Sequence, residues 1–217
     1  MSDAIETPRV VVLLDESGSM GALRGTVIQS TNKYLKDIKG KGLITVATFD
    51  KLGEEPILRV IMEDVPVKKA GGDLITEDNY FPRGWTPLYD AMRDLAKRVD
   101  KNGNKPAKVL FVINTDGLEN ASLTTADEMK KMVAKYEKRG WSFIYLGAHA
   151  DSWAESAKIG LARAGHSIQT VNTAVGTQTR DTVVAAMTTD YLSKGGEYDA
   201  DEWAKKVGKK IEEDAKL

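Results

Sequence analysis

The sequence predicts an α/β fold with a doubly wound, mostly parallel central sheet, one antiparallel edge strand and helices on both faces. Short apolar runs alternate with helical patterns along most of the 217 residues, an order typical of parallel sheets covered by helices on both sides. The runs at 10–14 and 109–113 are apolar at every position, as in strands buried on both faces. Two strand patterns separated only by a turn at 50–53 predict an antiparallel hairpin at the sheet edge.

The individual elements are expected in alternating order. Each expected strand is a short apolar run bounded by turn residues, and each expected helix has apolar residues at helical spacing. Gly40 and Gly140 stand where glycine commonly ends a helix, and Pro87 suits the first position of one. The expected strands are 10–14, 43–49, 57–62, 107–115, 141–147 and 166–171. The expected helices are 23–38, 87–99, 125–140, 151–165, 181–192 and 199–217.

The chain is long enough for one α/β domain and short for two. We expect a flexible N-terminus at 1–8, a single domain over 9–194, and a charged, helical C-terminal tail over 195–217. The tail is set apart because Gly195 and Gly196 interrupt the preceding helical pattern.

The composition excludes several classes of function. The chain has no cysteine, which excludes disulfide frameworks, thiolate zinc sites and cysteine nucleophiles. Lys and Arg number 31 against 32 Asp and Glu, a balance that argues against nucleic acid as a partner. No apolar run is long enough to cross a membrane, and the polar N-terminus does not resemble a secretory signal. We therefore expect a cytoplasmic protein that binds neither nucleic acid nor a membrane.

Acids and hydroxyls stand directly after two of the expected strands and directly before one expected helix. Asp15, Ser17 and Ser19 come directly after the first strand, Thr86 precedes a helix, and Asp116 follows a buried strand. In an open parallel sheet, ligands bind at the carboxyl ends of the strands, near the point where strand order reverses. An all-oxygen set without imidazole or sulfur suits Mg²⁺ or Mn²⁺, with Ca²⁺ also compatible. These five residues are therefore the candidate metal ligands.

Three separated motifs resemble the von Willebrand factor A family, also called integrin I-like domains. Asp15-Glu16-Ser17-Gly18-Ser19 is similar to the family's Asp-x-Ser-x-Ser motif, Thr86 to its loop threonine, and Thr115-Asp116-Gly117 to its Thr-Asp-Gly motif. The resemblance extends over about 9–193 and implies a Rossmann-like A-domain fold. The overall organisation resembles that of the solitary A domains of bacterial and phage proteins.

The resemblance also implies a function, that of a non-catalytic protein-binding module with a metal-ion-dependent adhesion site. In that family the hydroxyls matching Ser17, Ser19 and Thr86 hold Mg²⁺ directly, and the carboxylates matching Asp15 and Asp116 act largely through water. The implied partner is another protein that presents Asp, Glu or a terminal carboxylate to the ion. The resemblance names neither the partner nor the oligomeric state.

Other interpretations of the same residues remain open from the sequence. An acid after a first parallel strand also begins metal-dependent phosphotransferases and hydrolases, although Ser17 stands where those enzymes have a second acid. Some relatives of the family act with RNA, which is the second alternative. The stretch 15–19 could also simply cap a helix. We expect Glu16 to face solvent, Glu119 to be a loop charge or an acceptor that orients a ligand, and Trp85 to lie at the rim of the site.

Overall fold

The computed structural model describes residues 6–214 except 54, 117, 148–150, 164 and 170–173, and only the backbone at 55–57, 151–153, 169, 174–179 and 208–214. Gly117 of the third motif, residues 1–5 of the expected N-terminus and 215–217 of the expected tail therefore lie outside the described residues.

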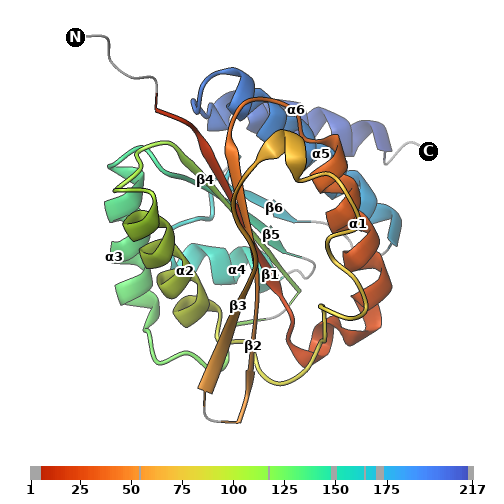
Figure 1. Ribbon diagram of the computed structural model, residues 1–217, viewed down its shortest axis with the longest axis vertical. Coiled ribbons are helices and arrows are strands. Elements are labelled where there is room, and N and C mark those ends of the chain that lie inside the picture. The colour runs from red at the N-terminus through yellow and green to blue at the C-terminus, as the bar shows by residue number, and fades with distance from the viewer. Residues whose placement is uncertain are drawn as a thin grey trace.

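A six-stranded sheet forms the centre of the molecule (Figure 1). Its strands are β1 (Arg9–Asp15), β2 (Leu43–Leu52), β3 (Glu55–Pro66), β4 (Val109–Thr115), β5 (Ser142–Gly147) and β6 (Ser167–Gln169). They lie in the order β3-β2-β1-β4-β5-β6, and every neighbouring pair is parallel except β2 with β3. This confirms the predicted fold class, including the antiparallel hairpin at one edge.

Helices cover both faces of the sheet. The helices are α1 (Arg24–Asp37), α2 (Leu88–Asn102), α3 (Ala126–Glu137), α4 (Asp151–Lys158), α5 (Ala174–Ser193) and α6 (Ala200–Asp214), with short 3-10 turns at Gly18–Leu23 and Val67–Lys69. α2 and α3 lie on one side of the sheet, and α1, α5 and α6 lie on the other (Figure 1).

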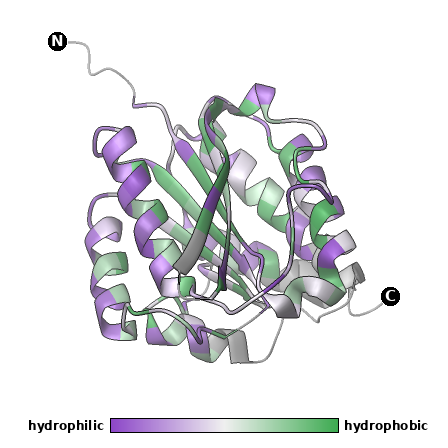
Figure 2. Ribbon diagram, turned by 60° about the horizontal axis from the view of Figure 1, so that its bottom comes forward, coloured by the Kyte–Doolittle hydropathy of each residue, from purple (hydrophilic) through white to green (hydrophobic). Residues whose placement is uncertain are grey.

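Alternate residues of β1 belong to two separate cores, one on each face of the sheet. Val10, Val12 and Leu14 pack with buried residues of α1, α5 and α6, whereas Val11 and Leu13 pack with those of α2 and α3. Successive side chains of a strand point to opposite faces, so a strand buried on both faces must be apolar throughout. Figure 2 shows largely green strands at the centre of the molecule, between helices that carry both green and purple residues.

The segment after the Gly195-Gly196 break also contributes to the core. α6 places Trp203 among the buried residues of the α1 and α5 face, and its indole N–H donates to Asp190 of α5 at 3.2 Å. Burying an aromatic ring with its polar atom paired is a favourable way to attach a helix. Among the described residues, no helix is long and apolar enough to span a membrane.

Two helix predictions differ from the structure. The helix expected over 151–165 ends at Lys158, because the chain turns at Gly160, whose φ of 83° is left-handed. The helix expected over 181–192 begins earlier, at Ala174. The sequence prediction started at the first regularly spaced apolar residues and therefore missed the polar first turns.

Candidate metal centre

The strand order reverses at β1 and β4, and the candidate ligands lie at this point. From β1 the chain crosses to β2 on one side, while β4 pairs with β1 on the other side, with Leu14 opposite Asn114. Asp15 is the last residue of β1 and Asp116 directly follows β4. Because the two strands are parallel neighbours, their carboxyl ends bring both acids to one edge of the sheet.

Asp15 is completely buried and its carboxylate is held from two sides. The backbone N–H of Ser17 donates to Oδ1 at 2.7 Å, and the Thr115 hydroxyl donates to Oδ2 at 2.6 Å. Burial, with a smaller contribution from the negative charge of Asp116, raises the pKa of Asp15 to about 6 against these hydrogen bonds. The carboxylate is thus fixed in orientation, and a nearby positive charge would relieve the cost of burying it.

A chain of oxygens connects the first motif with Asp116. The Ser17 and Ser19 hydroxyls lie 3.2 Å apart, and the Ser19 hydroxyl donates to Asp116 Oδ1 at 2.8 Å. Neighbouring oxygens around an octahedral Mg²⁺ lie about 3.0 Å apart, given metal–oxygen distances of about 2.1 Å. The three side chains therefore present oxygens at separations that suit one small divalent ion.

The loop that carries Thr86 is attached to both other motifs. Gly18 N–H donates to Gly84 O at 3.1 Å, which joins this loop to the first motif. Asn120, four residues after Asp116, accepts from Thr86 N–H at 2.8 Å and donates its own N–H to Thr86 O at 3.2 Å. Among the residues that the structure describes, no hydrogen bond joins the Thr86 side chain to the other four candidates. The structure thus joins the side chains of Ser17, Ser19 and Asp116 directly, connects Asp15 to them through the Ser17 backbone N–H, and holds the Thr86 loop against them.

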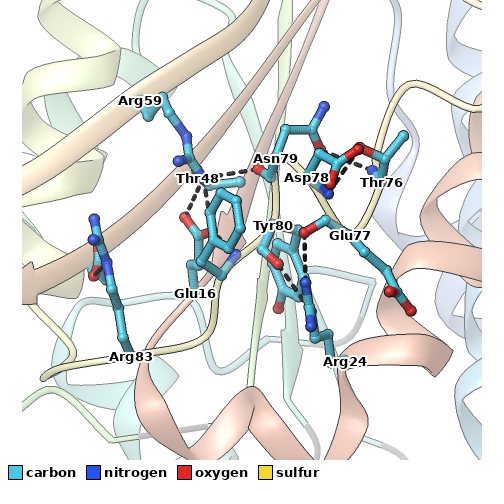
Figure 3. A network of polar contacts seen from close by, with 12 residues as sticks. Glu16, Arg24, Thr48, Arg59, Thr76, Glu77, Asp78, Asn79, Tyr80 and Arg83 are labelled. Atoms are coloured by element: carbon cyan, nitrogen blue, oxygen red, sulfur yellow. Dashed lines mark hydrogen bonds and ion pairs between the residues drawn. The ribbon is translucent and has the colours of Figure 1, made fainter.

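The prediction for Glu16 was wrong, because its side chain is 1% exposed. Both of its carboxylate oxygens accept from Arg59 Nη2 at 2.7 Å, and one also accepts from the backbone N–H of Phe81. The same guanidinium donates to the Asn79 carbonyl at 2.8 Å, and Figure 3 shows it pointing toward Glu16 and Asn79. Glu16 therefore ties the edge strand β3 and the segment before Thr86 to the end of β1.

Glu119 acts as a backbone acceptor in the loop after β4. Its carboxylate accepts from Tyr89 N–H in the first turn of α2, and from the N–H groups of Ala121 and Ser122. A carboxylate at the N-terminus of a helix satisfies free N–H groups and interacts favourably with the helix dipole. Together with Asn120, Glu119 fixes the position of the Thr86 loop relative to the loop that follows β4. The sequence prediction did not identify Asn120.

Solved structures of similar shape include a von Willebrand factor type A protein from Catenulispora acidiphila, with a TM-score of 0.61 and 15% identity over 85% of the present chain. The manganese-loaded TRAP protein of Plasmodium vivax has a TM-score of 0.63 and 14% identity over 87% of this chain. The chain has the von Willebrand factor A fold. A mussel byssus matrix protein whose adhesion-site motif is occupied by zinc shares the fold, with a TM-score of 0.56 and 14% identity over 86% of the chain.

The likeness rests on structure, since the sequence matches no family model and no curated protein. The chain spans 43% of the Catenulispora chain, 48% of the mussel chain and 74% of the Plasmodium chain. Two of these three structures hold a divalent metal, manganese in the Plasmodium protein and zinc in the mussel protein.

The candidate metal ligands of the present chain differ from those of metal sites that are built from several charged side chains. Among the described residues, no three His, Cys, Asp or Glu side chains form a group that could hold a metal ion. In this von Willebrand factor A fold, the candidate centre combines two carboxylates with three hydroxyls. Such oxygen ligands fit a hard divalent ion.

Gly84 should be indispensable for the loop that carries Thr86. Its φ is 65°, and a Cβ there would lie 2.1 Å from Lys51 O, which accepts the Trp85 N–H at 2.9 Å. We expect Gly84→Ala to lower the free energy of unfolding by about 3 kcal/mol, through left-handed strain and loss of this backbone pairing. Urea unfolding followed by circular dichroism measures the change.

Gly53→Ala is the matched control for Gly84→Ala. Gly53 also has a left-handed φ, of 73°, but a Cβ there meets no atom within 4 Å. We expect this control to lose only the strain, about 1 kcal/mol. Equal losses in the two variants would contradict a steric role for Gly84.

Proposed function

We propose that this protein is a non-catalytic, divalent-metal-dependent module that binds an acidic residue of a partner protein at Asp15, Ser17, Ser19, Thr86 and Asp116. The observation that carries the proposal is the continuous oxygen network from Ser17 through Ser19 to Asp116, placed where the strand order reverses. The metal-loaded structures of the same fold support it.

The chemistry of the donor set favours an acidic partner. A bound Mg²⁺ or Mn²⁺ would supply a strongly electron-accepting position for an oxygen ligand. Because Ser17 N–H and the Thr115 hydroxyl already occupy the Asp15 oxygens, Asp15 would act on the ion largely through water, and a direct carboxylate ligand would have to come from outside. A carboxylate neutralises the charge of the ion better than a neutral oxygen does. The same hydrogen bonds fix Asp15 in place and reduce its strength as a nucleophile, which supports the non-catalytic interpretation over phosphoryl transfer.

An affinity pull-down with the purified protein tests this function. Partners retained in Mg²⁺ should elute with EDTA, and mass spectrometry identifies them. Each acidic residue of a partner is then changed singly to the matching amide. We expect one such change to abolish Mg²⁺-dependent binding while the others have little effect. Binding that persists in EDTA, or that no single change removes, would refute capture of an acid through a metal.

Removal of divalent ions should leave the fold intact. The core packs on both faces of the sheet, and Asp15 and Asp116 are held by hydrogen bonds from the protein itself. We expect the circular dichroism spectrum in EDTA to match that in Mg²⁺, with the melting temperature in excess Mg²⁺ a few degrees higher through mass action. Unfolding in EDTA at room temperature would show that the site is structural and would contradict the proposed function.

A further inference from the structure

Large exposed apolar side chains gather at the edge of the sheet that carries the candidate metal centre. Among the described residues there are five, Leu52, Phe81, Trp85, Leu118 and Leu123, and all lie at the end of β2 or in the loops before α2 and α3. Scattered exposed apolar residues are ordinary, but a group of them around one site is typical of an interaction surface.

Two of these residues, Trp85 and Leu118, are here called the apolar rim. Trp85 and Lys51 exchange two backbone hydrogen bonds of 2.9 and 3.0 Å, which places Trp85 beside the end of β2, with its side chain on the same face as that of Lys51. Leu118 is two residues after Asp116, in the loop whose Asn120 holds the Thr86 backbone. The rim therefore adjoins the candidate ligands Thr86 and Asp116.

The backbone under the rim is fixed before any partner binds. Lys51 Nζ donates to Ala121 O at 3.2 Å, which joins β2 to the loop after β4, and Glu119 anchors that loop to α2. The Trp85 side chain is nevertheless 63% exposed. A large, rigidly mounted aromatic side chain loses little conformational freedom on binding and is a common centre of binding energy in interfaces.

The charges near the rim suit an acidic partner. Lys51 forms no ion pair with a carboxylate among the described residues, and its ammonium group has a neutral carbonyl as its acceptor. On the other side of the site, the Arg24 guanidinium likewise donates to the carbonyls of Tyr80 and Glu77 (Figure 3). Each of these cations keeps a charge that a neighbouring acid on the partner could neutralise.

We propose that the apolar rim binds an aromatic or long aliphatic side chain that stands beside the metal-directed acid in a segment of the partner protein. This inference rests on the proposed function and adds the chemistry of the segment, an acid with an adjacent apolar residue. The metal centre selects the acid, whereas Trp85 and Leu118 select its neighbour. Lys51 favours segments that carry a second acid.

A phage-displayed library of random dodecapeptides tests the inference. It is selected on the immobilised wild-type protein in Mg²⁺ and eluted with EDTA. We expect the enriched peptides to contain an acid with an aromatic or long aliphatic residue within two positions of it. The same selection on the Trp85→Ser, Leu118→Ser double variant should still enrich the acid but lose the apolar neighbour. A synthetic peptide from the wild-type selection should bind this variant at least tenfold more weakly, while Mg²⁺ binding stays unchanged.

Leu123→Ser provides the matched control, because Leu123 is 86% exposed in the same loop as Leu118 but its N–H is directed to Asp90 of α2. This variant should bind the peptide like the wild type.

Two results would overturn the role of the rim and leave the proposed function standing. One is an equal weakening of peptide binding by Leu123→Ser. The other is that peptides selected on the wild-type protein contain an acid but no apolar neighbour. Peptides that lack an acid, or a selection that yields no peptide eluted by EDTA, overturn the proposed function itself. Self-association of the protein that the rim substitutions abolish would assign the rim to a second copy and also overturn the inference.

Discussion

Mg²⁺ titrated into the Asp116→Ala variant should give no binding heat beyond dilution, whereas the wild-type protein should give saturable binding. Asp116 ends the oxygen network by accepting from Ser19 at 2.8 Å, and it supplies one of the two carboxylates of the candidate centre. Changes to groups that only orient metal ligands cost 10–100-fold in affinity as an order of magnitude. Loss of a carboxylate from the centre itself should exceed that range. Isothermal titration calorimetry at fixed pH and salt measures it.

Two further variants make this result specific. Asp94→Ala removes an acid on α2 that pairs with Arg93 away from the centre, and it should bind Mg²⁺ like the wild type. Asp116→Asn keeps an acceptor for the Ser19 hydroxyl but removes the charge, so its affinity should fall between those of wild type and Asp116→Ala. All variants should melt at the wild-type temperature in EDTA. Equal Mg²⁺ binding by Asp116→Ala and wild type would contradict the assignment of the five ligands.

The sheet could be predicted from the sequence because its strands carry a simple pattern. Every residue of β4 is buried, and its apolar run has no polar interruption before Asn114. Helix ends were harder to predict. The stretch after Lys158 contains good helix formers, yet Leu161 N–H donates to Ser156 O at 2.8 Å and the chain turns instead of continuing the helix. Gly160, whose φ is 83°, ends the helix there, a local signal that the sequence prediction did not use because it followed the spacing of the apolar residues.

The positions of the candidate ligands could be predicted for a related reason. A residue that directly follows a buried parallel strand must lie at the carboxyl edge of the sheet, so Asp15 and Asp116 were placed together by topology alone. The surroundings of Glu16 could not be predicted, because its partner Arg59 lies 43 residues later on the edge strand. Next to an acid and two serines, Glu16 has the local appearance of a solvent-exposed residue. Only the register of β2 with β3 brings Thr48 and Arg59 to face it.

Glu16→Ala should lower the free energy of unfolding by about 2–3 kcal/mol. The substitution leaves the Arg59 guanidinium without its carboxylate and the Phe81 N–H without its acceptor. Removing one partner of a fully buried ion pair costs roughly 3–5 kcal/mol. The Arg59 side chain is 34% exposed, so water can partly replace the lost partner and the expected cost is smaller. Urea unfolding of the metal-free protein measures it.

Comparison with Asp37→Ala distinguishes the stability lost with a buried acid from the stability lost with an exposed ion pair. Asp37 pairs with Lys33 on the exposed face of α1, where both side chains are at least 40% exposed, and its loss should change the stability by at most about 0.5 kcal/mol. Glu16→Gln should fall between the two, because an amide oxygen still accepts from Phe81 N–H without carrying the charge. Since Glu16 ties β3 and the segment before Thr86 to the end of β1, Glu16→Ala should also weaken Mg²⁺ binding. A Glu16→Ala variant as stable as Asp37→Ala would mean that the Glu16–Arg59 pair does not hold this loop in place.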